Sequence, residues 1–193
     1  MNTQINTSQK PRFFSTVNLV MMALFAAILC VLAPISVPIG PVPISLTNLL
    51  IYVFCYILGW KKGTISYIVY LLIGLAGLPV FSGFEGGIGK LAGPTGGYLI
   101  GFIFMTVICG IVVEYFEKST VPHRIIHFVG MVLATALVYT FGTVWFCFST
   151  GTGAMAAMAI CVLPFIPGDL IKMAVAVVVG PTLKSQLQKI GRV

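Results

Sequence analysis

Two ionisable side chains, Asp169 and Lys172, stand inside the otherwise apolar stretch PFIPGDLIKMA near the C-terminus. A charge at the centre of a lipid bilayer costs about 2.5–3.5 kcal/mol on insertion scales, so such residues usually serve a purpose. Spaced i, i+3, the two lie on one face of a helix and can pair. They either lock this helix against its neighbours or line a polar cavity. The preceding Pro167-Gly168 favours a cavity, because it places Asp169 in the first helical turn, at the positive end of the helix dipole.

A second polar segment, FSGFEGGIGKLAGPTGGYLIGF at 81–102, combines seven glycines between 83 and 97 with Glu85 and Lys90. Its backbone amides would be unsatisfied in lipid, so the segment must lie in water, inside the protein or around a polar ligand. A helix is expected to begin near Pro94-Thr95, where its N-terminus can receive an anion or a carbonyl group. A phosphate-binding loop is excluded, because Leu91 follows Gly89-Lys90 and no strand precedes the segment. We therefore do not expect the chain to bind ATP itself.

Several other side chains are weaker candidates. Asn48, Phe81, Phe84 and Tyr98 either line the same cavity or serve packing and the membrane interface. His123 and His127 are spaced i, i+4 without a carboxylate or thiol partner, which favours an interfacial role over a metal site. Neither HExxH nor GxSxG occurs in the chain, so we expect neither catalysis nor a cofactor.

These residues must be positioned by membrane helices. Of 193 residues, 59% are hydrophobic and only 8% are charged, whereas soluble domains carry about 25% charged residues. The net charge of +7 does not indicate nucleic-acid binding, because the basic residues form no stripe with interleaved aromatics. The composition indicates an all-α integral protein of the lipid bilayer.

Apolar runs of about 20 residues are needed to cross the hydrocarbon layer, and fewer where the ends are anchored. The sequence predicts one domain over 1–193 with a tail at 1–14 and six helices. The helices are expected at about 15–33, 44–59, 63–79, 95–116, 124–148 and 166–184. A further apolar stretch at 153–164 ends at Pro164 and is expected to form a short interfacial helix or ordered loop. A seventh crossing there is the alternative.

Charge distribution predicts the orientation. With both termini inside, nine of the eleven lysines and arginines fall on the inner side, as the positive-inside rule requires. The tail at 1–14 is then cytoplasmic. The outer segments 34–43, 80–94 and 149–165 are long and rich in proline and glycine, whereas the inner turns are short and basic. Function is therefore expected at the outer face.

Two alanines one helical turn apart, Ala23 and Ala27, form a small-xxx-small surface in the first predicted helix. Such a surface lets another helix approach closely. It serves either packing within the chain or docking of another membrane protein.

The glycine-rich signature, the PGDLIK stretch and the AxxxA pair together resemble the BioY family over nearly the whole chain. That family is the biotin-specific substrate-binding (S) component of energy-coupling factor (ECF) transporters. The resemblance implies a multi-pass protein of the bacterial plasma membrane, with six spans, that captures the vitamin at the outer face. A coupling transmembrane subunit and two ATPase subunits then drive release inside, and Ala23 and Ala27 contact the coupling subunit.

The resemblance also implies roles for single residues. Lys90, Asp169 and Lys172 are assigned to binding, with Asp169 accepting from the ureido N–H groups of biotin and Lys172 donating to its carbonyl. The glutamine that many relatives carry early in helix two falls in SLTNLL, where Thr47 or Asn48 takes its place. The glycine segment and aromatic residues would cover the ring. The predicted binding set is Asn48, Phe81, Lys90, Gly93, Thr95, Tyr98, Asp169 and Lys172.

A proton-coupled secondary transporter, with Asp169 as the proton carrier, is the alternative. The chain shows no obvious inverted repeat of helices, which argues against it.

Overall fold

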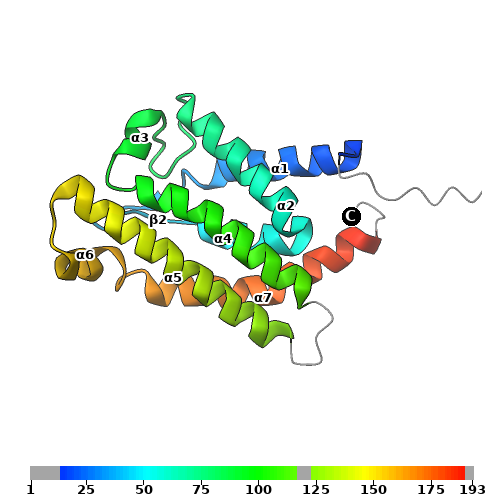
Figure 1. Cartoon of the computed structure of the whole chain (residues 1–193). Helices are drawn as coiled ribbons and strands as arrows, with labels where there is room; N and C mark the ends of the chain where they lie inside the picture. The colour runs from blue at the N-terminus through cyan, green and yellow to red at the C-terminus, as the bar shows by residue number, and fades with distance from the viewer. Residues whose placement is uncertain (1–13, 117–122, 190–193) are drawn as a thin grey trace, which may run out of the picture.

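The computed structural model describes residues 14–116 and 123–189, which are mostly helical (Figure 1). The long helices are α1 (Thr16–Leu32), α2 (Thr47–Leu75), α4 (Gly96–Tyr115), α5 (His123–Thr150) and α7 (Ile166–Lys189). Two helices are short, α3 (Ile88–Ala92) and α6 (Ala154–Cys161), and two-residue strands β1 (Ser36–Val37) and β2 (Ile44–Ser45) pair antiparallel. The predicted all-α class is confirmed, with this small β-ribbon as an addition.

Helix α2 consists of two arms that fold back on each other at Gly59, whose φ of 68° and ψ of −173° are not helical. Asn48 near the start of the first arm lines the same cavity as Phe81, whose ring lies against Gly74 near the end of the second arm. The turn itself lies against the far end of α4, where the Trp60 backbone N–H donates to Glu114 Oε1 at 3.2 Å. The two arms therefore correspond to the two predicted helices at 44–59 and 63–79.

The limits of these arms differ from the prediction at both ends. The first arm begins at Thr47, because residues 44 and 45 are paired in β2. The second arm ends at Leu75, four residues early. Gly77 follows with a φ of 105°, a left-handed conformation that terminates helices and that glycine adopts without strain.

Close packing of α4 against α5 depends on the GxxxG pair at Gly97 and Gly101. A Cβ atom at Gly97 would lie 2.3 Å from the Cβ of Trp145, and one at Gly101 would lie 3.2 Å from the Cα of Val138. Because no side chain intervenes, the two helix backbones come close together. The GxxxG motif therefore serves packing of α4 against α5.

Three helices, α4, α5 and α7, are long and apolar enough to cross a membrane, and α1 is a shorter apolar helix of 17 residues. Many large apolar side chains on these helices are exposed, including Val20, Leu24, Leu133 and Val178. Helix α6 has eight residues and is about 12 Å long, too short to cross the hydrocarbon layer. It matches the short helix predicted at 153–164 and not the seventh crossing.

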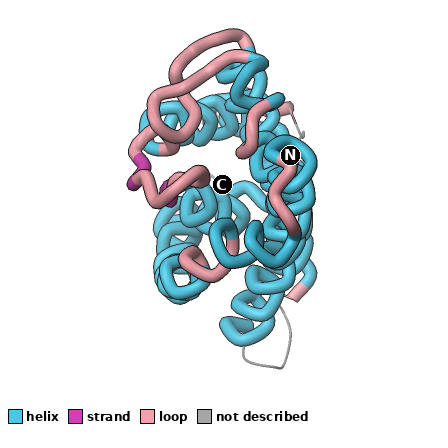
Figure 2. The backbone as a smooth tube through the Cα atoms, turned by 90° about the vertical axis from the view of Figure 1, so that its left-hand side faces the viewer, coloured by secondary structure: helices cyan, strands magenta, loops and turns pink. Residues whose placement is uncertain are grey.

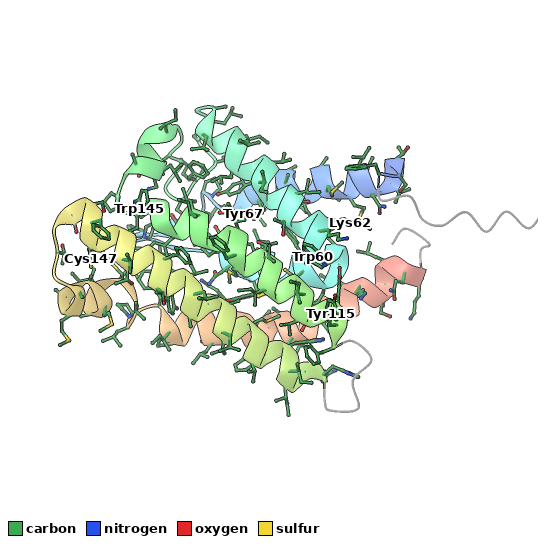
Figure 3. All side chains as sticks on the ribbon, in the orientation of Figure 1. Trp60, Lys62, Tyr67, Tyr115, Trp145 and Cys147 are labelled. Carbon is green, nitrogen blue, oxygen red and sulfur yellow. The ribbon has the colours of Figure 1, made fainter. Side chains whose placement is uncertain are left out.

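The two ends of the helix bundle differ in construction. Residues 33–46, 76–95 and 151–165 gather at one end, the loop end, on which Figure 2 looks directly. Trp145 lies toward the loop end, whereas Trp60, Lys62 and Tyr115 lie toward the opposite end (Figure 3). Tryptophan and tyrosine at both ends of a bundle are typical of the two membrane–water interfaces.

Candidate functional site

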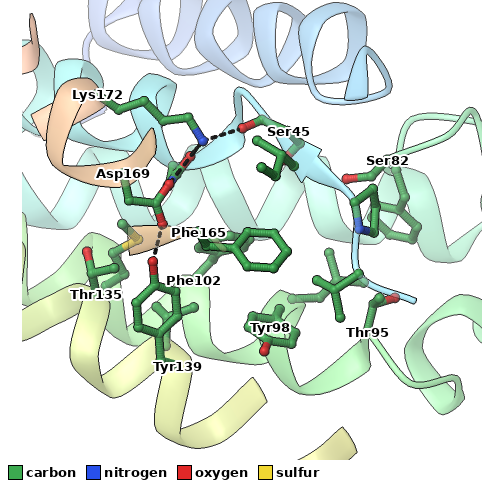
Figure 4. A pocket seen from close by; sticks show the side chains of 18 of the residues that line it. Ser45, Ser82, Thr95, Tyr98, Phe102, Thr135, Tyr139, Phe165, Asp169 and Lys172 are labelled. Atoms are coloured by element: carbon green, nitrogen blue, oxygen red, sulfur yellow. Dashed lines mark hydrogen bonds and ion pairs between the residues drawn. The ribbon is translucent and has the colours of Figure 1, made fainter. Parts of the chain in front are cut away.

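A cavity opens at the loop end among α2, α4, α5, α7 and the preceding loops (Figure 4). It contains about 670 Å³ of atom-free space, its open mouth included. Seven of the eight predicted binding residues line it. They are Asn48, Phe81, Lys90, Thr95, Tyr98, Asp169 and Lys172.

One wall of the cavity is a buried polar cluster centred on Asp169, whose side chain is 6% exposed. Lys172 Nζ lies 3.0 Å from Asp169 Oδ1, and Asn48 Nδ2 donates to the same oxygen at 2.6 Å. The Tyr139 hydroxyl donates to Oδ2 at 2.6 Å. Helices α2, α5 and α7 each contribute to this cluster, so it forms only when all three pack together.

Lys172 uses all three of its N–H donors within the protein. Its Nζ donates to the Ser45 carbonyl at 2.8 Å, to Asn48 Oδ1 at 3.0 Å and to Asp169 Oδ1. Asp169 Oδ2 accepts one described hydrogen bond, from Tyr139, and a carboxylate oxygen can accept a second. A ligand N–H group can therefore join Asp169 directly, whereas a ligand carbonyl must displace one acceptor from Lys172.

Thr47 and Asn48, the two candidates for the position of the family glutamine, differ in their contacts. Both polar ends of Asn48 belong to the cluster, since Nδ2 donates to Asp169 and Oδ1 accepts from Lys172. The Thr47 hydroxyl instead bonds Ser45 Oγ at 3.0 Å, and Thr47 is not a lining residue. Asn48 therefore lines the cavity, whereas Thr47 does not.

The remaining walls are apolar and aromatic. Phe81 is fully buried, and its ring meets Tyr70 edge to face with centroids 5.7 Å apart. The Tyr98 hydroxyl donates to the Cys161 carbonyl at 3.2 Å, and Figure 4 shows it pointing away from Asp169. Tyr98 therefore offers the cavity its ring, which suits a flat apolar group. Other apolar residues of these walls are Val42, Pro43, Ile44, Leu99, Phe102, Met105, Val138 and Phe165.

The glycine-rich segment is held mainly by its own backbone and its neighbours. The Gly87 N–H donates to the Gly74 carbonyl at 2.7 Å, and the Gly83 N–H donates to the Pro34 carbonyl at 3.0 Å. A Cβ atom at Gly86 would lie 2.2 Å from the Leu78 carbonyl oxygen. These glycines therefore allow the chain to pack tightly on itself. The backbone N–H groups of Gly83 and Gly87 are satisfied by carbonyl groups of the protein.

Two residues of this segment that were candidates for the cavity, Phe84 and Gly93, do not line it. Phe84 has a φ of 59° and is 66% exposed, and it does not line the cavity, whereas Phe81 does. Gly93 also lies outside the lining, and its carbonyl accepts from Trp145 Nε1 at 3.0 Å. Thr95 precedes α4 without making a capping hydrogen bond, and it lines the cavity.

Lys90 is the second cation of the cavity. Its Nζ lies 2.9 Å from Glu85 Oε2, and its side chain is 13% exposed against 59% for Glu85. Lys90 thus sits on the glycine segment with its charge balanced by an exposed carboxylate that another anion could replace.

The sequence analysis missed two direct partners of the charged pair. Tyr139 stands in an apolar helix that also contains Thr135 and Thr140, so its hydroxyl is a weak signal. Ser45 contributes its backbone carbonyl, which no side-chain pattern can predict. Phe165, Ser82 and Thr135 line the cavity as well.

Ala23 and Ala27 lie on the exposed face of α1, whereas Met22, Phe25 and Ala26 are buried. The pair therefore does not serve packing within the described chain.

The chain is similar to known proteins in both sequence and fold. The family model described as the BioY family matches residues 2–189. A "Biotin transporter BioY" of Thermotoga maritima is 36% identical over 166 residues, covering 86% of this chain and 95% of that protein. A "Probable biotin transporter BioY" of Pyrococcus horikoshii is 35% identical over 164 residues, covering 85% and 94%. A crystal structure of "the S-component for biotin from an ECF-type ABC transporter" matches with a TM-score of 0.80 and 32% identity, over 87% of this chain and 90% of that one.

Proposed function

The chain belongs to the BioY family, and on that premise we propose that it is the biotin-binding S component of an ECF-type transporter. It is a membrane protein and not an enzyme, and it captures biotin for uptake driven by separate subunits. The observation that carries the proposal is the cavity at the loop end, where Asp169, Lys172 and Asn48 form one buried cluster opposite aromatic walls.

We propose that the cavity opens to the outside of the plasma membrane. Six crossings with both termini inside follow when each arm of α2 counts as one short crossing. Lys61, Arg124 and Lys189 lie at the end opposite the loops, which supports this orientation.

Biotin offers two N–H donors and a carbonyl on its ureido ring, an apolar sulfur ring and a carboxylate. A ureido N–H group would donate to Asp169 Oδ2 beside Tyr139. The ureido carbonyl would accept from Lys172 in place of the Ser45 carbonyl or Asn48 Oδ1. The ring would lie among Phe81, Tyr98 and their apolar neighbours, and the carboxylate would replace Glu85 as the partner of Lys90.

Transport requires partners. The coupling transmembrane subunit would dock on the exposed surface around Ala23 and Ala27, and it would connect the chain to two ATPase subunits. Two small residues one turn apart leave α1 flat there, so that another helix can approach closely.

Isothermal titration calorimetry on the purified chain tests the ligand. We expect one biotin per chain, bound without ATP or added metal, and no heat from riboflavin or thiamin. Binding of another vitamin without biotin binding would overturn the ligand and leave the transporter class intact.

The proton-coupled alternative gains no support from the cluster, because three donors already engage the two oxygens of Asp169. Uptake by cells that keep their ATP while a protonophore collapses the proton gradient should persist. Loss of uptake under those conditions would favour the alternative.

A further inference from the structure

A second cavity lies at the end of the bundle opposite the loops, among α2, α4, α5 and α7. It contains about 800 Å³ of atom-free space, its open mouth included. It is lined by Tyr56, Val113, His123, Arg124, His127, Pro181, Lys184, Ser185 and Gln188. None of these residues belongs to the biotin cavity, and none has a role in the proposed transport function.

Among the residues that the structure describes, the lining of this cavity contains the cations Arg124 and Lys184 and no carboxylate. Arg124 comes from the first turn of α5 and Lys184 comes from α7, so packing of two separate helices brings two cations to one cavity. The nearby Glu114 is held by the turn of α2, where Oε1 accepts from the Trp60 backbone N–H at 3.2 Å. The positive-inside rule accounts for cations at this end of the molecule but not for their convergence on a cavity.

The cavity is built around a buried polar pair. The Tyr56 hydroxyl lies 3.1 Å from His127 Nδ1, and both residues are buried. Gly180 lets α7 approach this pair, since a Cβ atom there would lie 2.1 Å from the Tyr56 ring. Pro181, Lys184, Ser185 and Gln188 follow on one face of α7, spaced i, i+3, i+4 and i+7, and add a cation and two polar side chains.

The depth of the cavity indicates which anions can reach it. Lys184 is 15 residues beyond Asp169 on α7, or about 22 Å along the helix axis. Across a hydrocarbon layer of about 30 Å, that distance brings Lys184 close to the inner interface. Phosphate groups are the abundant anions there, both on lipid headgroups and in solution, and basic pockets between membrane helices suit them.

We propose that this inner cavity is an anion site that binds a phosphate group, with Arg124 and Lys184 as its principal ligands. Arginine matches the geometry of phosphate with two parallel N–H donors, and lysine adds a compact charge. Ser185 and Gln188 supply further hydrogen bonds. The proposal rests on the membrane orientation proposed above and not on biotin as the ligand.

Thermal unfolding of the detergent-solubilised chain can measure this binding. The probes are dihexanoyl phosphatidylglycerol, dihexanoyl phosphatidylcholine as a headgroup without net charge, and inorganic phosphate. We expect the melting temperature to rise with phosphatidylglycerol or inorganic phosphate at concentrations where phosphatidylcholine has no effect. In the double variant Arg124→Gln/Lys184→Gln, the concentration of phosphatidylglycerol or inorganic phosphate that gives the same rise in melting temperature should be about tenfold higher or more.

The matched control is Lys61→Gln/Lys189→Gln, which removes two exposed charges from the same end outside the cavity. It should respond like the wild type. Ser185→Glu keeps every cation but adds a carboxylate to the lining, and it should weaken binding as the double variant does. Biotin binding on the same preparations reports folding, because the outer cavity is remote from these residues.

The two phosphate sources give different results. A response to phosphatidylglycerol that inorganic phosphate does not displace indicates a lipid headgroup. A response to inorganic phosphate alone indicates a soluble phosphate. Absence of both responses would overturn the proposal, as would equal weakening in the two double variants, since the effect would then be one of overall charge.

Discussion

At the scale of single residues, the binding site depends on how donors and acceptors are shared. Asp169 accepts from Asn48, Tyr139 and Lys172, and Lys172 also reaches Asn48 and the Ser45 carbonyl. Breaking such a buried ion pair by removing one partner is costly, because the other charge is stranded. The cluster can therefore hold a rigid geometry for a polar ring and still exchange single hydrogen bonds with it.

Asp169→Asn should weaken biotin binding by roughly one to two orders of magnitude, because a hydrogen bond to a charged group contributes about 1.5–3 kcal/mol. Lys172→Met should act similarly by stranding the ureido carbonyl and Asp169. Calorimetry and thermal unfolding on the same preparations separate binding from folding. Near-normal biotin affinity in a folded Asp169→Asn protein would remove the pair from the site and leave it the role of locking helices together.

Tyr139→Phe and Tyr98→Phe form a matched pair, since both remove one hydroxyl from a tyrosine that lines the cavity. The Tyr139 hydroxyl donates to Asp169 Oδ2, whereas that of Tyr98 donates to the Cys161 carbonyl. Tyr139→Phe should weaken biotin binding by about tenfold, in line with one hydrogen bond to a charged group. Tyr98→Phe should lower the melting temperature with little effect on affinity. The reverse pattern in calorimetry would contradict this assignment.

At the scale of elements, the turn of α2 brings Asn48 and the end of the second arm to the same cavity. Gly59 has a φ of 68°, and a Cβ atom there would lie 1.7 Å from Glu114 Oε1. This close approach lets the turn pack against α4. The turn of the helix hairpin therefore favours glycine at position 59.

Gly59→Ala should lower the free energy of unfolding by about 1–3 kcal/mol, because alanine is strained at this φ and would displace Glu114 Oε1 from its hydrogen bond with the Trp60 N–H. Gly89→Ala is the control: it lies in α3, outside the left-handed region of φ, and a Cβ atom there meets nothing within 4 Å. Chemical denaturation in detergent should show a clear loss for the first variant and almost none for the second. Equal stability of the two would mean that the turn tolerates a side chain.

At the scale of the whole molecule, the described chain presents a cavity with aromatic walls at the loop end, a cationic cavity at the opposite end and an apolar surface between them. Such an arrangement suits a subunit that takes its ligand from one side of a membrane and meets its partners within the bilayer. The exposed alanine pair on α1 is where we expect the coupling subunit to dock.

Replacing both Ala23 and Ala27 by Trp should abolish biotin uptake by the assembled transporter while biotin binding by the isolated chain survives. The bulky rings would prevent close approach of a partner helix. Val129→Trp/Leu133→Trp places two rings at the same i, i+4 spacing on an exposed apolar face of α5 and should leave uptake intact. Loss of binding in the alanine variant would instead assign the pair to packing within the chain.

Much of this organisation followed from local patterns. Apolar runs predicted where the long helices lie, and the spacing of Asp169 and Lys172 predicted their contact, because both depend on residues close together in the chain. The turn near Gly59 and the short helix before Pro164 could also be predicted, since glycine and proline act on their own backbone.

The tertiary structure decided which distant groups complete the site. Asn48 and Asp169 are 121 positions apart, and Lys172 and the Ser45 carbonyl are 127 apart. Whether Thr47 or Asn48 faces the cavity, and whether Phe81 or Phe84 does, depends on the rotation of a helix and the path of a loop. The contact of Tyr139 with Asp169 likewise depends on how α5 is rotated relative to α7. Helical periodicity specifies which residues share a face, but only the packing of α2, α5 and α7 determines what that face meets.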